Sequence, residues 1–208
     1  MRRRNVETML PIIPDRALPP VATAQIAQAI KASGVVDYFH VWDQMGNFWP
    51  TQMWNSQNAP RAATIPDLDS NGDPFAVAAY AAAAAPGLGL TVSTDAIRRG
   101  PAEMMQTMLT LANIGEGRAV LQLGAGEIKQ CAPFGWKRNE GLRRSEDHFR
   151  FYDAFWKSDG AVTMNGNFWN FDRAWIGASR QHRPKMWALG GGPKLVELAT
   201  RYAHGFAT

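Results

Sequence analysis

The stretch LGLTVSTDAIRRGPAEMMQTMLTLANIGEGRAVLQLGAGE, residues 88–127, decides the fold class. It opens with an apolar, β-branched run, 88–94, that predicts a buried strand. Pro101 is typical of a first helical position, and the apolar residues after it recur at helical spacing. A second apolar run, 118–124, predicts another strand. Strand, helix and strand in this order indicate a βαβ unit, whose two strands run parallel.

The same alternation continues on both sides of this stretch. Further strands are predicted at residues 5–13, 35–43, 185–189 and from 205, and further helices at 21–33, 74–85, 139–157 and 193–203. Two segments interrupt the pattern: 44–72 has no clear period, and 159–183 contains turn residues that indicate a small hairpin.

Alternating βα units with apolar strands predict an α/β fold in which helices cover a parallel sheet. An open doubly wound sheet and a closed (β/α)8 barrel both fit this pattern. A complete barrel typically takes ~250 residues, whereas the 208 residues hold five βα units and the start of a sixth strand. A barrel built from this sequence would therefore be incomplete.

The composition is that of a globular protein, with 46% apolar and 19% charged residues. No apolar run approaches the ~20 residues that a membrane-spanning helix needs, and we expect no membrane span. The single cysteine, Cys131, excludes an internal disulfide and favours a cytoplasmic location. The net charge of +4 is modest and comes partly from Arg2–Arg4, so we expect no nucleic-acid partner.

Three strand ends carry candidate binding residues, because ligands bind at the carboxyl ends of parallel strands. Gly190, Gly191 and Gly192 precede a helix that begins at Pro193. They indicate either a phosphate cradle of open backbone amides or a tight turn. Glu127 follows Gly-Ala-Gly and is either a proton donor or polar anchor, or an exposed loop residue. Asp43 ends its strand either at the mouth of the sheet or as a cap of the next loop.

The histidines are interpreted as structural or peripheral. We expect His40 to pack between strand and helix, facing away from Asp43, and His148 to lie at the surface or rim of its helix. His182 and His204 have no partners at metal-ligand spacing, so no metal site is predicted.

Two groups of large apolar residues favour different roles. Met104, Met105 and Met108 recur at helical spacing and are interpreted as core. Phe48, Trp49 and Trp54 lie in the long irregular stretch. They indicate either a lid or apolar substrate wall, or a satellite core under the loop. The absence of GxSxG, P-loop and GxGxxG motifs gives hydrolase and nucleotide-kinase functions no support.

Together these stretches resemble the bacterial luciferase-like superfamily, and within it the branch that uses the deazaflavin coenzyme F420, including phthiodiolone-ketoreductase-type enzymes. Residues 88–127 are similar to the family's strand, Arg-x-x-Pro helix start, Gly-Arg before a strand and Gly-x-Gly-Glu after it. DYFHVWDQM and LGGGPKLVELATRYAHGF resemble its second and fifth units, so the resemblance covers roughly 35–208. It implies a single (β/α)8 TIM-barrel domain over 1–208, incomplete at its C-terminus, with the coenzyme across the C-terminal mouth.

The resemblance also implies residue roles. Asp43 would contact the deazaflavin head, and Thr91 with Val92 would form a strained bulge behind the ring. Glu127 would lie beside the reacting carbon as acid or electrostatic support. Gly190–Gly192 would hold the coenzyme's phosphate.

The sequence departs from the family pattern at two places. Gln44 stands where F420-dependent relatives have a proton-handling histidine, and an amide donates a hydrogen bond but does not shuttle protons near neutral pH. Arg98-Arg99-Gly100-Pro101 lacks one polar side chain of the family's motif. Three explanations stay open: Glu127 or substrate-bound water supplies the proton, the chemistry differs, or the chain is inactive.

The function that this resemblance implies is hydride transfer between F420 and a carbonyl or alcohol carbon of an apolar, lipid-like substrate. An FMN-dependent monooxygenase of the same superfamily is the alternative. A truncated, non-catalytic barrel segment is the third interpretation. An incomplete barrel also implies a partner, either a homodimer or another chain, that completes it.

Overall fold

The computed structural model describes residues 6–47 and 49–208. Expectations for Phe48, for Arg2–Arg4 and for the first residue of the 5–13 strand therefore lie outside the described residues. The helices are α1 (Pro20–Ser33), α2 (Pro74–Ala84), α3 (Pro101–Ile114), α4 (Ile128–Cys131), α5 (Gly141–Lys157) and α6 (Pro193–Tyr202), with short 3-10 turns at Thr51–Met53, Pro60–Ala63, Ala132–Phe134 and Arg138–Glu140. Among these residues, no helix is both apolar and long enough to span a membrane.

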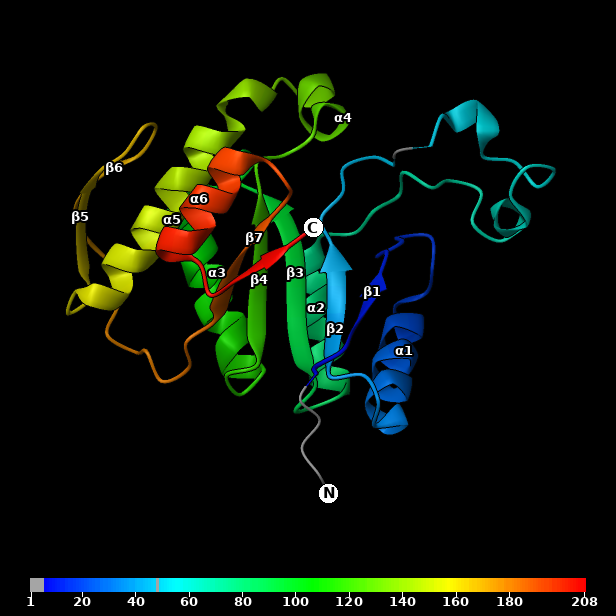
Figure 1. Ribbon diagram of the computed structural model, residues 1–208. Coiled ribbons are helices and arrows are strands. Elements are labelled where there is room, and N and C mark those ends of the chain that lie inside the picture. Colours follow the sequence, from blue (N-terminus) through cyan, green and yellow to red (C-terminus); the bar gives the residue numbers. More distant parts are fainter. Residues whose placement is uncertain (1–5, 48) are drawn as a thin grey trace.

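Six strands form one parallel sheet in the order β1-β2-β3-β4-β7-β8 (Figure 1). Their bounds are β1 Met9–Ile12, β2 Tyr38–Trp42, β3 Gly89–Asp95, β4 Ala119–Gly124, β7 Lys185–Leu189 and β8 Gly205–Ala207. A separate antiparallel hairpin, β5 (Ala161–Asn165) with β6 (Asn170–Trp175), confirms the hairpin predicted within 159–183. The predicted α/β fold with a parallel sheet is confirmed.

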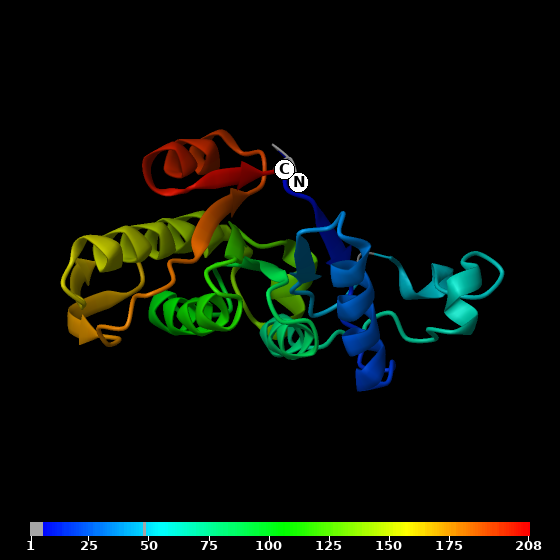
Figure 2. The same cartoon turned by 90° about the horizontal axis from the view of Figure 1, so that it is seen from below.

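The sheet curves into an open arc, and the helices lie on its outer side (Figure 2). Phe39, Val41, Leu90 and Val92 point to this outer side and are at most 1% exposed in the core between sheet and helices. The alternate residues of each strand point to the inner side of the arc, since successive side chains of a strand point to opposite faces. The fold is therefore a parallel half-barrel that opens toward one side.

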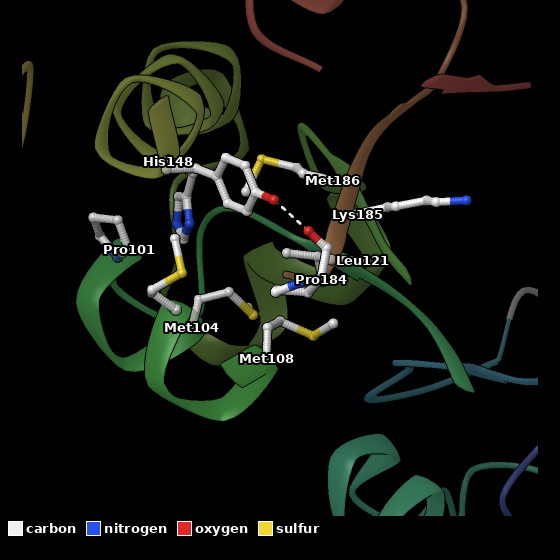
Figure 3. A pocket seen from close by; sticks show the side chains of 10 residues that line it. Pro101, Met104, Met108, Leu121, His148, Pro184, Lys185 and Met186 are labelled. Carbon is white, nitrogen blue, oxygen red and sulfur yellow. Dashed lines mark hydrogen bonds between the residues drawn. The ribbon is translucent and has the colours of Figure 1, made fainter. Parts of the chain in front are cut away.

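The methionine cluster fills the outer core, as predicted. Met104, Met105 and Met108 belong to α3 and are 1–3% exposed. Their side chains fill the space between α3, α5 and β7. Figure 3 shows Met104 and Met108 beneath His148, near the hydrogen bond that the Tyr152 hydroxyl donates to the carbonyl of Pro184. Flexible thioethers suit such an irregular gap between two helices and a strand.

The prediction that His148 lies at the surface or rim is wrong. Its side chain is 1% exposed, and Nε2 lies 3.0 Å from the carbonyl oxygen of Arg99, to which it donates a hydrogen bond. The Trp169 ring packs edge-on against it at 5.5 Å. The hairpin that contains this tryptophan covers a part of α5 that the sequence pattern leaves exposed.

Acid should destabilise the chain through His148. Burial lowers the pKa of His148 to about 4, below the ordinary value of about 6.5, so the unfolded chain binds this proton more readily. The resulting stability is fully present above pH 6.5 and is lost as the pH falls from there to about 4. The loss from this residue is about 3 kcal/mol.

Urea unfolding of the wild type and His148→Gln at pH 7 and pH 4 measures this contribution. The wild type should lose more free energy of unfolding between the two pH values than the variant does. Equal losses in the two proteins would contradict this account of His148.

Candidate active site

A large cleft of about 1170 Å³ opens on the inner side of the sheet, at the carboxyl ends of its strands. It brings together Asp43, Gln44, Glu127 and the glycines Gly190–Gly192. These residues are far apart in sequence, and they meet because each follows a strand of the same parallel sheet. The cleft is the candidate active site.

Asp43 is the centre of a buried ion pair at the mouth of the cleft. Its Oδ2 accepts a hydrogen bond from the Thr94 hydroxyl at 2.6 Å, and its Oδ1 lies 3.0 Å from Nη1 of Arg98. Arg98 also donates to the Asp43 carbonyl at 3.0 Å and to Oδ2 of Asp95 at 2.7 Å. Burial raises the pKa of the Asp43 carboxyl, and the neighbouring Arg98 acts in the opposite direction. The arginine thus ties the end of β2 to the end of β3.

Gln44 and Glu127 line the cleft in different ways. The Oε1 atom of Gln44 is buried and finds no hydrogen-bond donor within the described ranges. Glu127 is exposed and immediately precedes α4, without capping that helix through its side chain. Gln130 of α4 fixes the segment after Gln44, because its Oε1 accepts hydrogen bonds from the amides of Met45 at 2.6 Å and Gly46 at 3.2 Å.

The glycine loop, Gly190–Gly192, connects β7 to α6 at the rim of the cleft. Gly190 has a φ of 128°, which favours glycine, and its amide donates to the carbonyl of Ala207 at 2.9 Å. A Cβ at Gly191 or Gly192 would meet no atom within 4 Å. Neither amide donates to another described residue. Internal packing therefore does not require these two glycines, and their amides stay open to a ligand.

Two cationic side chains line the same cleft as this loop. Lys194 is the second residue of α6, and it lines the cleft together with Arg138. The N-terminus of a helix carries a partial positive charge that favours anions. Open amides, a helix N-terminus and two cationic side chains form an arrangement suited to an anionic group.

Thr91 and Val92 do not form a bulge, contrary to the expectation. β3 pairs without a register shift with β2 on one side and with β4 on the other. Val92 is fully buried in the core on the helix-covered side, and neither residue lines the cleft. The hydroxyl of Thr91 is buried and has no hydrogen-bond partner in the described part of the chain.

His40 lies on the inner side of the sheet and lines the cleft, so its predicted place between strand and helix is wrong. Asp43 lies beyond the last residue of β2, where strand alternation no longer relates the two side chains. His40 shares this inner side with Ser93 and Gln122, two residues that sequence reasoning missed. Polar residues at alternate positions of otherwise apolar strands were the available signal.

The aromatic wall of the cleft is also not the predicted one. Trp49 and Trp54 do not line the cleft. Trp54 donates from Nε1 to the carbonyl of Ile65 at 2.7 Å, within the loop itself, while Trp49 is 54% exposed. The rings that line the cleft are Trp42, Trp187 and Phe206, from the strands β2, β7 and β8. Within residues 6–47 and 49–208, no three His, Cys, Asp or Glu side chains are placed to hold a metal ion.

Comparison with known proteins places these features in a family. The phthiodiolone/phenolphthiodiolone dimycocerosates ketoreductase of Mycobacterium sp. (strain JLS) is 29% identical over 82% of this chain and 47% of its own length. The F420-dependent glucose-6-phosphate dehydrogenase of Nakamurella multipartita is 31% identical over 58% of this chain and 36% of its own length.

The fold has solved counterparts. An F420-dependent secondary alcohol dehydrogenase in complex with an F420-acetone adduct is 25% identical. The match has a TM-score of 0.68 and covers 96% of this chain and 56% of that one. The chain thus spans about half the length of the curated ketoreductases that it matches. The family profile described as luciferase-like monooxygenase matches residues 22–208. The chain belongs to this luciferase-like family of oxidoreductases.

Proposed function

We propose that the chain forms the coenzyme side of an F420-dependent oxidoreductase that acts on a carbonyl or alcohol carbon of an apolar substrate. The observation that carries this proposal is the glycine loop, whose open amides lie on the same cleft as Asp43, Gln44 and Glu127. The similarity to F420-dependent dehydrogenases and to lipid ketoreductases supports the choice of coenzyme and substrate class.

The residues present fit an anionic coenzyme. The amides of Gly191 and Gly192 would donate to its phosphate, and the space that a Cβ would fill allows the phosphate to approach the backbone closely. Lys194 and Arg138 would pair with the remaining negative charge. We place the deazaflavin head at the Asp43 end of the cleft and keep Thr91 and Val92 as candidates for the strand behind it.

The bound coenzyme would supply the carbon that gives or takes the hydride. Within the chain, the unpartnered Oε1 of Gln44 would accept a hydrogen bond from a substrate hydroxyl, which orients that oxygen. Glu127 would add negative charge or a proton at the rim. Trp42 and Trp187 would exclude water and give an apolar, lipid-like substrate a hydrophobic wall.

An FMN-dependent monooxygenase is the second candidate, and the name of the matching family profile favours it. The same glycine loop would hold the phosphate of FMN. A third candidate is a non-catalytic barrel segment, which the half-length match to the relatives favours. In that case a second copy or another chain would have to complete the barrel before any chemistry occurs.

Anaerobic turnover separates these candidates. The chain is mixed with reduced F420 and 2-decanone under nitrogen, and the return of the oxidised deazaflavin absorbance is followed. We expect oxidised coenzyme and 2-decanol to form in equal amounts, because each reduced coenzyme gives one hydride to one ketone. The reaction should proceed under nitrogen because it needs no oxygen. Oxygen consumption with reduced FMN and 2-decanone, without anaerobic turnover, would instead identify a monooxygenase. Inactivity in both assays would favour the non-catalytic segment.

A further inference from the structure

Three polar side chains form a hydrogen-bonded row across the inner side of the sheet. His40 on β2, Ser93 on β3 and Gln122 on β4 are 7%, 8% and 4% exposed. The Nε2 atom of His40 lies 2.6 Å from the Ser93 hydroxyl oxygen, which lies 2.7 Å from Oε1 of Gln122. All three residues line the same cleft as Gln44 and Glu127.

The row has a definite direction. The Nε2 atom of Gln122 lies 3.5 Å from the sulfur of Met9, which can only accept, and this contact orients the amide. Oε1 of Gln122 therefore faces Ser93 and accepts its single hydroxyl hydrogen. Because that hydrogen is used, Nε2 of His40 must donate to the Ser93 oxygen. The neutral imidazole then carries its proton on Nε2 and a free lone pair on Nδ1.

Nothing in the described chain uses that lone pair, since Nε2···Ser93 is the only hydrogen bond that His40 makes there. A purely structural histidine would place both ring nitrogens against protein partners, because a buried, unpaired polar atom is costly. The open acceptor of His40 instead belongs to a side chain on the wall of the cleft.

We propose that Nδ1 of His40 exchanges the proton of the substrate's hydroxyl group, directly or through one water. His40 would thus perform the proton transfer that Gln44, four residues later in the chain, is chemically unable to perform. This inference rests on the proposed oxidoreductase function and adds a proton-transfer residue to it.

The step balances in both directions. In alcohol oxidation, the O–H proton moves to Nδ1 of His40 while the C–H electron pair leaves as hydride to the oxidised coenzyme, and the C=O bond forms. In ketone reduction, the hydride returns to the carbonyl carbon and the imidazolium gives its proton to the oxygen. Throughout, Nε2–H stays bonded to Ser93, and the Ser93-to-Gln122 hydrogen bond stabilises the imidazolium charge.

The charge environment is consistent with a neutral acceptor. Burial lowers the pKa of His40 to about 4, so the ring is unprotonated at pH 7. The nearest charged groups at these strand ends are Asp43, just after β2, and Asp95, the last residue of β3, and both are paired with Arg98 at the mouth of the cleft. Met9, Ser93 and Gln122, the residues that complete the row from β1, β3 and β4, are uncharged.

Chemical modification tests whether Nδ1 is open to the cleft. Diethylpyrocarbonate acylates neutral imidazole nitrogen, and peptide mass spectrometry reports each histidine separately. We expect His40 to react in the free chain and to be protected at saturating F420, while the buried His148 stays unmodified in both states. An unreactive His40, or one that reacts equally with and without bound F420, would overturn the proposal.

Kinetics test the proton transfer itself. His40→Gln keeps a donor for Ser93 but has no exchangeable base, and His40→Asn serves if the longer amide prevents folding. With F420 affinity unchanged, either variant should oxidise 2-decanol about 10²- to 10⁴-fold more slowly than the wild type. A solvent deuterium isotope effect on the wild-type rate should accompany this loss.

The two proposals fail in different ways. A variant that binds F420 and turns over at the wild-type rate would overturn the role of His40 and leave the oxidoreductase function standing. A wild type that does not bind F420, or binds it without oxidising 2-decanol, would overturn the proposed function and the role of His40 with it.

Discussion

Replacing Arg98 with methionine is expected to destabilise the chain by about 3–5 kcal/mol. The guanidinium is the shared partner of Asp43 and Asp95, and the side chains of all three residues are only 6–7% exposed. Its removal leaves two carboxylates in a poorly hydrated place, one of them held only by Thr94. Urea unfolding at pH 7 measures the loss. The mouth of the cleft should become less ordered, because Arg98 no longer joins the carboxylates of Asp43 and Asp95 at the ends of β2 and β3.

Arg201→Met is the matched control. Arg201 pairs with Glu197 one turn earlier on α6, and both side chains are about 60% exposed. Exposed pairs of this kind contribute about 0.3–0.5 kcal/mol, so the control should unfold close to the wild type. If the two variants had the same free energy of unfolding, the buried ion pairs of Arg98 would not stabilise the ends of β2 and β3.

Gly141→Ala is expected to cost about 4 kcal/mol or more, at the upper end of overpacking effects. Gly141 begins α5 with φ of −56° and ψ of −42°, a conformation that alanine adopts readily. At a helical position, intrinsic helix propensity favours alanine over glycine by about 1 kcal/mol. A Cβ at this position, however, would lie 1.8 Å from the carbonyl oxygen of Ala125. That oxygen belongs to the backbone of the β4–α4 connection and moves only with the strand end.

Gly191→Ala provides the comparison, because a Cβ there would meet no atom within 4 Å. This variant should unfold at the wild-type urea concentration, whereas Gly141→Ala should unfold far earlier or fail to fold. Wild-type stability of Gly141→Ala would show that the start of α5 is looser than the structure describes. The pair separates a glycine required by packing from one left open for a ligand.

Much of the fold could be predicted from local sequence signals. α2, α3 and α6 begin at Pro74, Pro101 and Pro193, as the preference of proline for the first helical turn indicates. α1 ends before Gly34, whose φ of 63° is the left-handed geometry typical of a helix end. The apolar runs between these helices became the strands of the parallel sheet. These helix and strand boundaries depend on residues that are close together in the chain, so the sequence alone can predict them.

The two buried histidines show what local sequence signals do not predict. Strand alternation separates the two faces of β2 but does not tell which face the helices cover, so the sequence predicts the wrong side for His40. The helix pattern alone predicts a surface position for His148, because the Trp169 ring that covers it comes from a hairpin later in the chain. Both errors concern which helix or hairpin packs against a given face of a strand or helix. A short stretch of sequence does not contain this information.

The candidate site divides in the same way. That Asp43, Glu127 and the glycine loop meet at one edge could be predicted, since each follows a parallel strand. The row of His40, Ser93 and Gln122 could not be predicted, because it depends on the register between β2, β3 and β4. That register joins residues that are far apart in the sequence. The bulge expected at Thr91 and Val92 came from the family resemblance, and the regular pairing of β3 corrects it.

The measurement that tests the central claim most directly is a fluorescence titration of the chain with F420. Gly191→Asp and Gly191→Ala are measured beside the wild type. We expect saturable binding to the wild type and at least tenfold weaker binding to Gly191→Asp, about 1.4 kcal/mol or more. The added carboxylate would occupy and repel the phosphate position without disturbing a packed neighbour. Absence of saturable binding to the wild type, or equal affinity of Gly191→Asp, would contradict the account.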